Sequence, residues 1–253
     1  MAPCSPSLPR VWEKPQEAGA PEASGLILVG TVHGDPKGHA RVRHLLEQLR
    51  PEAVSVEISS FSVRYRTRHG PGWQRQLEGA LAVLPPEVKE HLAVRRLAAT
   101  VRLPYEWQAA VAFGRRHRVP VVAVDASAPA REHLPRYARK LLTPENLLAL
   151  AALPDGPVTA WAAGEYRRAR LCAWRPLRWL PGETLAEVQH REEVMARRLR
   201  RLARRFRCLV HLGGWEHLAP REPEGNLFDR LADLHPRRWL LEDVEARPAR
   251  PAL

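Results

Sequence analysis

The feature that most constrains this chain is an alternation of short apolar runs with longer segments of helical periodicity. An apolar run over Gly25–Gly30 is followed by apolar residues at helical spacing from Lys37 to Leu49, and then by a second run over 53–58. Runs that are apolar throughout are typical of strands buried on both faces. Strand, helix and strand within about 35 residues predict a βαβ unit with parallel strands.

The rest of the chain continues this alternation. Two helices, over 105–117 and 183–207, lead into apolar strands over 121–125 and 208–212, the latter broken by Gly213–Gly214. A short helix near 227–234 and a strand near 238–241 finish the pattern. We therefore predict an α/β fold, with a central mostly parallel sheet flanked by helices, in a single domain with a helical insertion. The predicted boundaries are a flexible extension over 1–24, the domain over 25–245 and a flexible tail over 246–253.

The composition of the 253 residues is basic, with a formal net charge of +12, and lysine occupies so few positions that 36 of the 40 basic residues are arginine. Such a charge could attract nucleic acid, anionic lipid or an acidic substrate. The arginines are spread along the whole chain, however, and no zinc-finger spacing, RNA-binding signature or helix-turn-helix accompanies them. A nucleic-acid partner is therefore not expected, and nucleic-acid binding through the arginine surface stays open only as a third, weaker alternative.

The cysteines and the apolar runs bear on the compartment. Cys4, Cys172 and Cys208 are far apart and odd in number, which fits neither a metal site nor a disulfide framework. The first residues lack the apolar core of a signal peptide, and the longest apolar run, 147–153, is far below the roughly 20 residues of a membrane span. We expect a cytoplasmic protein without a membrane contact, and the oligomeric state stays open.

Polar side chains follow each of the four apolar strands. His33 follows the first strand, Glu57 ends the second, Asp125 ends the third, and Glu216 with His217 follows the fourth. Ligands of open parallel sheets bind beyond the carboxyl ends of the strands, so these side chains would converge. The pattern Gly-x-x-His occurs twice, at 30–33 and 214–217.

Arg191 is the arginine that we expect to point inward, because it lies one turn before Met195 on the edge of the apolar stripe of its helix. Two imidazoles and a carboxylate could hold Mn²⁺, Fe²⁺, Co²⁺ or Zn²⁺ and lower the pKa of a bound water; the candidate ligands are His33, Glu57 and His217. Without a metal, Glu57 could orient His33 as a general base toward water. Arg191 would stabilise an oxyanion or bind an anionic group.

Each residue also has a structural interpretation. Asp125 alone is more typical of a turn or a helix cap, and the glycines could be turn residues. Trp215 is expected to pack, and His211, inside an apolar strand, is expected to be a hydrogen-bonded core histidine.

Together these motifs resemble the TraB/PrgY/GumN proteins, which are related to the TIKI proteases and to erythromycin esterase-like and ChaN-like proteins. The resemblance covers about 25–218. It rests on G-T-V-H at the first strand end, R-P-E-A-V-S-V-E ending at Glu57, and the helix that carries Glu106. It continues with the strand ending in Asp125, with R-E-E-V-M from Arg191, and with the closing G-G-W-E-H-L. Where the family often has Glu before the arginine, this chain has His190, and Trp215-Glu216 replaces small residues.

The resemblance implies hydrolysis in a cleft built by two Gly-x-x-His motifs, a Glu and an Arg. That hydrolysis is metal-dependent peptide cleavage in the TIKI branch and metal-independent lactone opening in the esterases. It carries over His33, Glu57, Arg191 and His217 as catalytic residues, with Glu106, Asp125, His190 and Glu216 as secondary candidates. We therefore expect a hydrolase of peptide or ester bonds acting on a peptide or small molecule, with or without a divalent metal. The alternative is a non-catalytic module that binds a peptide or a small anion in the same cleft.

Overall fold

The structure is a computed structural model, and it describes residues 12, 25–172, 177, 184–221 and 225–246. Its centre is a five-stranded sheet in the order β3-β2-β4-β1-β5, in which all pairings are parallel. The strands are β1 (Gly25–Thr31), β2 (Ala53–Val56), β3 (Val121–Ala123), β4 (Cys208–Gly214) and β5 (Arg237–Leu240). The predicted α/β fold is confirmed, and the sheet is wholly rather than mostly parallel.

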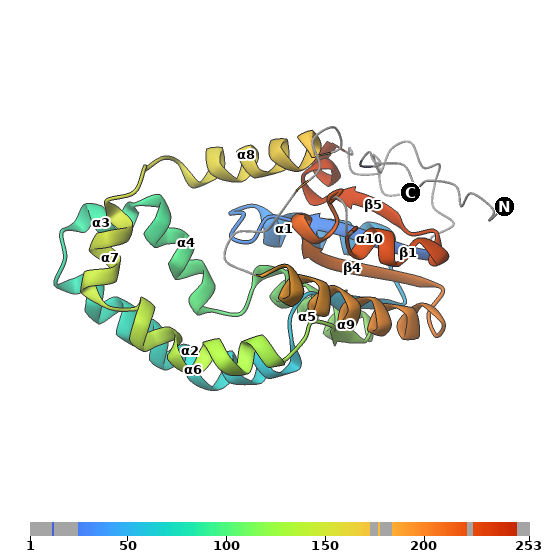
Figure 1. Cartoon of the computed structure of the whole chain (residues 1–253), viewed down its shortest axis with the longest axis horizontal. Coiled ribbons are helices and arrows are strands. Elements are labelled where there is room, and N and C mark those ends of the chain that lie inside the picture. The colour runs from blue at the N-terminus through green and yellow to red at the C-terminus, as the bar shows by residue number, and fades with distance from the viewer. Residues whose placement is uncertain (1–11, 13–24, 173–176, 178–183, 222–224, 247–253) are drawn as a thin grey trace.

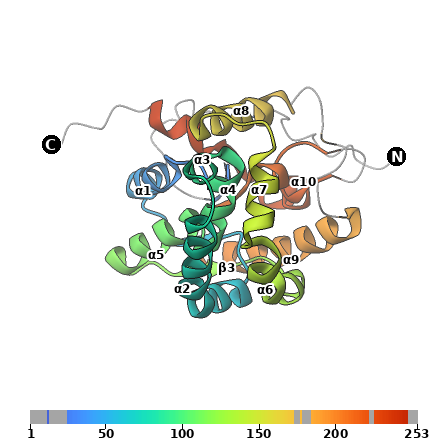
Figure 2. The same cartoon turned by 90° about the vertical axis from the view of Figure 1, so that its left-hand side faces the viewer.

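Helices cover both faces of this sheet. One face carries α1 (Gly38–Leu49) and α5 (Tyr105–His117), and the other carries α9 (Leu185–Ala203) and α10 (Leu227–Arg230) (Figure 2). The apolar faces of these helices and both faces of the strands form one large core. The strands β1, β2 and β4 are buried almost throughout because helices cover them on both sides, which is why they are apolar runs without alternation. The edge strand β3 is half-buried.

The helical insertion is a second layer of helices beside the sheet (Figure 1). It contains α2 (Ser60–Ala82), α3 (Pro86–Glu90) and α4 (Leu92–Val101) from the β2–β3 connection, and α6 (Ala128–Leu141) and α7 (Pro144–Ala151) from the β3–β4 connection. These helices have their own apolar core, which includes Trp73, Leu77, Val94, Leu134 and Leu147. The last helix of the connection, α8 (Val158–Leu171), returns toward the sheet and packs its buried face into the main core.

The strand order places a crevice at the carboxyl edge of the sheet. The chain leaves β1 for β2 and β3, then returns to insert β4 between β1 and β2, and finally adds β5 on the far side of β1. Connections that diverge in this way leave a gap beyond the strand ends, where ligands of open parallel sheets bind.

Two sequence-based expectations are wrong in detail. Gly213 and Gly214 do not break the fourth strand: they pair with Gly30 and Thr31 as the last residues of β4. Glycine continues a strand here because the space that a side chain would fill is taken by neighbouring side chains. The long helix is also shorter than predicted, because a capping box formed by Thr184 and Glu187 begins it and it ends at Ala203.

Within the predicted flexible extension over 1–24, the structure describes Trp12. Its ring is buried against Gly30, and its Nε1 donates a hydrogen bond to the carbonyl oxygen of Ala169 at 2.9 Å. The guanidinium of Arg238 lies 4.9 Å from the centre of the ring. The rest of the predicted extension and residues 247–253 of the predicted tail lie outside the described residues.

Among the described residues, none of the helices combines the length and the apolar character needed to cross a bilayer.

Candidate functional site

The register of the sheet brings the predicted strand-end residues to one place. Thr31 is level with Gly214 across the β1–β4 pair, and Val56 is level with Leu212 across the β2–β4 pair. Glu57 follows Val56 directly, and its backbone N–H donates to the Leu212 carbonyl oxygen at 2.8 Å. The residues just after β1, β2, β3 and β4 therefore surround the same crevice.

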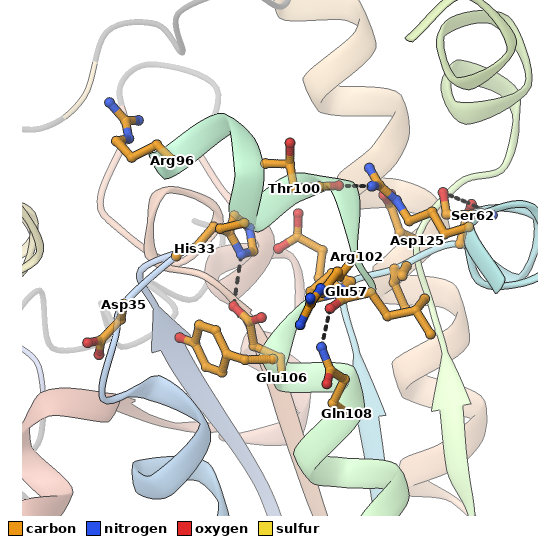
Figure 3. Close-up of a pocket in the computed structure, with 18 of the residues that line it drawn as sticks. His33, Asp35, Glu57, Ser62, Arg96, Thr100, Arg102, Glu106, Gln108 and Asp125 are labelled. Carbon is orange, nitrogen blue, oxygen red and sulfur yellow. Dashed lines mark hydrogen bonds and ion pairs between the residues drawn. The ribbon is translucent and has the colours of Figure 1, made fainter. Parts of the chain in front are cut away.

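His33 forms a pair with Glu106. Nδ1 of His33 lies 2.8 Å from Oε1 of Glu106, and the two side chains approach each other from the loop after β1 and from the first turn of α5 (Figure 3). Thr31 donates a second hydrogen bond to the same oxygen at 2.9 Å. The carboxylate is buried at 2% exposure, whereas the imidazole is 54% exposed. Glu106 thus orients a histidine that remains open on its other side.

The charge of this histidine is set by its acidic neighbours. Removal from bulk water disfavours the imidazolium, but Glu106 first, and then Glu57 and Glu216, favour it and raise the pKa of His33 to about 9. At neutral pH the resting side chain is therefore an imidazolium.

Glu57 is the centre of the second cluster. Its Oε1 accepts a hydrogen bond from Arg191 at 2.8 Å and lies 3.1 Å from Nε2 of His217, while its Oε2 accepts the backbone N–H of Gly214 at 2.7 Å. Burial disfavours the charge of Glu57, but His217 and Arg191 hold its pKa well below the usual range. Glu57 is thus a fixed anion that ties the second Gly-x-x-His motif to α9.

His217 has a different environment from His33. Its Nδ1 lies 3.1 Å from Glu192, so both of its ring nitrogens face carboxylates. Burial opposes the imidazolium, but Glu57 and Glu192 raise the pKa of His217 to about 10. Arg221 donates to the same oxygen of Glu192 at 2.9 Å. His217 is therefore a buried cation within a network of ion pairs.

Arg191 points inward from α9, as predicted. Its Nε and one terminal nitrogen each donate to Asp125 at 3.1 Å, and that same terminal nitrogen reaches Glu57. A planar guanidinium suits this bidentate contact. Arg191 therefore forms ion pairs with both Asp125 and Glu57 at the base of the crevice.

Gly214 makes room for the site. A Cβ added at Gly214 would lie 3.3 Å from His33 Nε2, 3.2 Å from Glu216 Oε2 and 3.6 Å from Glu57 Oε2. These three side-chain ends therefore surround one small space, no more than about 7 Å across between His33 and Glu57. Such a spacing is within reach of a shared water or substrate atom.

Of the remaining candidates, Glu216 belongs to the site and His190 does not line it. Burial raises the pKa of Glu216, which lies near His33 as described above. His190 is exposed on α9.

His211 is a core histidine as expected, with its Nδ1 3.1 Å from the hydroxyl of Ser55, and burial lowers its pKa to about 4. Trp215 packs in the core, also as expected.

Sequence reasoning did not identify Glu192 or Arg221. Glu192 shares the buried face of α9 with Val188 and Met195, at helical spacing. A glutamate within an apolar stripe was the available signal, but Glu192 stands in a run of charged residues that resembles a solvated face. Arg221 lies in a segment with no periodicity.

The predicted metal ligands Glu57 and His217 are engaged by other side chains in this arrangement. A ligating imidazole must offer a lone pair, but both ring nitrogens of His217 face carboxylates. Glu57 likewise has both oxygens occupied by donors. Within the described ranges, no group of three or more His, Cys, Asp or Glu side chains is arranged to hold a metal ion.

A pocket of about 510 Å³ opens over these residues. Its floor is the carboxyl edge of the sheet, where His33, Glu57, Glu106, Asp125 and Arg191 lie. Its wall comes from the helical insertion, through α2, α4 and the segment that leads into α5 (Figure 3). The pocket is large enough for a small molecule or a short peptide segment.

Comparison of the chain with protein-family models, with curated proteins and with solved structures found no match.

Proposed function

We propose that the protein is a hydrolase that cleaves a peptide or ester bond in this pocket. The observation that carries the proposal is the His33–Glu106 pair, in which a buried carboxylate lies 2.8 Å from one ring nitrogen of an accessible histidine. A carboxylate that fixes the tautomer and orientation of a histidine is the arrangement that general-base catalysis uses. The motif resemblance to TraB/PrgY/GumN proteins points to the same reaction class.

In the proposed reaction, the neutral form of His33 removes a proton from a water through Nε2 while the water oxygen bonds to the substrate carbonyl carbon. Glu106 stabilises the imidazolium that forms. The carbon–heteroatom bond then breaks, and the departing oxygen or nitrogen takes the proton from His33. The carboxyl group of Glu216, whose pKa burial raises, lies beside Gly214 on the same side as Nε2 of His33.

The other predicted catalytic residues have supporting roles in this proposal. Arg191 was expected to stabilise an anionic intermediate, but its contacts with Asp125 and Glu57 favour a role in holding Glu57 in place. His217 holds the other side of Glu57. We propose that this network shapes the floor of the pocket.

The test is hydrolysis of a panel of activated esters and peptides by the purified protein and two variants. His33→Ala should lose at least about 100-fold in kcat/KM, because it removes the general base. His190→Ala, which changes an exposed histidine on α9, should match the wild type. Equal activity in wild type and His33→Ala would overturn the hydrolase, and the non-catalytic binding module would then be the better account.

A divalent metal remains a prediction of the sequence, and chelation tests it directly. With His33 activating water, activity should survive treatment with EDTA, and Mn²⁺, Co²⁺, Fe²⁺ or Zn²⁺ should leave Tm unchanged. Loss of activity in EDTA and recovery with one of these ions would instead establish the metal.

We also propose a reducing, cytoplasmic location. Cys172 and Cys208 are buried free thiols, which fits a compartment where disulfides do not form.

A further inference from the structure

The wall of the pocket differs in charge from its floor. Arg66 of α2, Arg96 of α4 and Arg102, directly after α4, all line the pocket from the helical insertion. The floor, in contrast, contains the carboxylates of Glu57, Glu106 and Asp125 and the cations of His33 and Arg191, so that its charges are close to balanced. The pocket therefore has a basic side opposite the reacting groups.

Within the part of the chain that the structure describes, the three wall arginines have no carboxylate partner. Arg66 donates to the carbonyl oxygen of Thr100 and lies over the rings of Trp73 and Tyr137. Arg96 lies 4.2 Å from the centre of the Trp161 ring. Among the described residues, neither of these two nor Arg102 has an ion pair. This contrasts with Arg191 and Arg221, whose charges are matched by buried carboxylates.

An unmatched cation at a pocket wall favours an anionic ligand. Partial burial lowers the pKa of Arg66, because the charged guanidinium is less stable where it is partly removed from water. A guanidinium binds carboxylate and phosphate oxygens through two parallel N–H groups, and such charge-assisted bonds are the strong ones. Ser62 and Thr100 add hydroxyl groups along the same wall (Figure 3).

We propose that the substrate carries a carboxylate or phosphate group that binds Arg66 and Arg102, with Arg96 at the rim, and so turns its scissile bond toward His33. The orientation of the scissile bond rests on the proposed hydrolase function, whereas the anion site does not depend on it. The carboxylates of the floor would repel the anionic group, so the two ends of the ligand are distinguished by charge. The polarity of the pocket thereby selects both the substrate class and its orientation.

The activity test compares two chromogenic esters of similar length, neutral 4-nitrophenyl valerate and the 4-nitrophenyl monoester of glutaric acid, which ends in a carboxylate. Arg102→Gln is the main variant, because Arg102 is exposed and its replacement should leave the fold intact. Arg66→Gln is the second. Arg75→Gln is the matched control, since Arg75 is an exposed arginine of α2 that does not line the pocket.

Each pocket variant should lower kcat/KM for the glutarate ester about tenfold or more, mainly through KM, and leave the valerate ester within about twofold. Arg75→Gln should change neither. Equal losses for the two esters, or a loss in Arg75→Gln as large as in Arg102→Gln, would overturn the anion site in favour of a general effect of surface charge.

Binding of glutarate and of inorganic phosphate, measured by calorimetry on the same proteins, separates this inference from the proposed function. Binding that weakens about tenfold in Arg102→Gln and not in Arg75→Gln supports the anion site, even if neither ester is cleaved and the hydrolase proposal fails. The anion that binds more tightly identifies the anionic group that the substrate carries. No binding of either anion at 10 mM, together with no preference for the charged ester, would overturn the inference.

Discussion

At the scale of single residues, the two Gly-x-x-His motifs do different work. His33 contacts a carboxylate through one ring nitrogen and leaves the other toward the pocket, whereas His217 contacts carboxylates through both. Only a histidine with a free nitrogen can accept a proton from water, so of the two similar motifs only the first places a histidine that could do so. The difference depends on Glu106 and Glu192, which lie far from either motif in the sequence.

The raised pKa of His33 predicts the pH dependence of activity. A general base must be neutral, and with a pKa of about 9 only a few per cent of His33 is neutral at pH 7.5. We expect kcat/KM to rise about tenfold per pH unit from neutrality and to level off near pH 9. A profile that falls over this range would mean that the imidazolium is the active form.

Glu106→Gln tests the same pair from the other side. The amide keeps the shape of the side chain but removes the charge that favours the imidazolium. The inflection of the kcat/KM profile should therefore move below pH 9, while the maximal rate falls about 100-fold because the histidine loses its orienting carboxylate. A lower rate with an unmoved inflection would indicate a purely structural role for Glu106.

The buried ion pairs around Glu192 predict a large effect on stability. Glu192→Gln leaves the buried charge of Arg221 without its counterion, and breaking a buried pair in this way typically costs about 3–5 kcal/mol. Glu193→Gln, at the exposed neighbouring position, should change the free energy of unfolding by less than about 0.5 kcal/mol. Urea titration of both variants measures the difference, and equal values would contradict the assignment of Glu192 as a structural anion.

At the scale of elements, the strands were predictable because burial on both faces makes them continuous apolar runs. The helix predicted over 105–117 has the observed bounds of α5. The end of β4 was not predictable, because Gly213 and Gly214 look like a turn until Glu57 and His211 are seen to fill the space beside them. Glycine identity alone cannot distinguish a turn from a close approach of side chains.

This explanation of Gly214 predicts the effect of a single methyl group. In Gly214→Ala the added Cβ would lie 3.2–3.3 Å from Glu216 and His33, so these side chains must shift by a few tenths of an ångström. We expect kcat/KM to fall about tenfold, since small displacements at a reacting centre are costly. Gly79→Ala in α2 is the control: no atom lies within 4 Å of its added Cβ, so the variant should gain about 0.5–1 kcal/mol in stability and keep full activity.

At the scale of the whole molecule, the fold class and the edge of the sheet that carries the site were predictable, but the pocket was not. The pocket wall comes from Arg66, Arg96 and Arg102, which belong to helices with a separate apolar core. Because 36 of the 40 basic residues are arginine, the sequence does not distinguish three arginines that face a pocket from those that face solvent. Trp12 escaped prediction for a similar reason, because a lone aromatic residue among prolines and charges carries no periodicity.

The network beneath the pocket couples the stability of the whole domain to pH. Because the pKa of His217 is raised from about 6.5 to about 10 in the folded protein, its stabilising contribution is complete below pH 6.5 and is lost as the pH rises to about 10. The free energy of unfolding should therefore differ most between wild type and His217→Gln below pH 6.5, and the difference should shrink progressively up to pH 10. Denaturant titrations at a series of pH values measure it, with His190→Gln as the exposed control that should follow the wild type throughout. A difference that stays constant from pH 6.5 to 10 would show that His217 stabilises the fold by packing rather than as a buried cation.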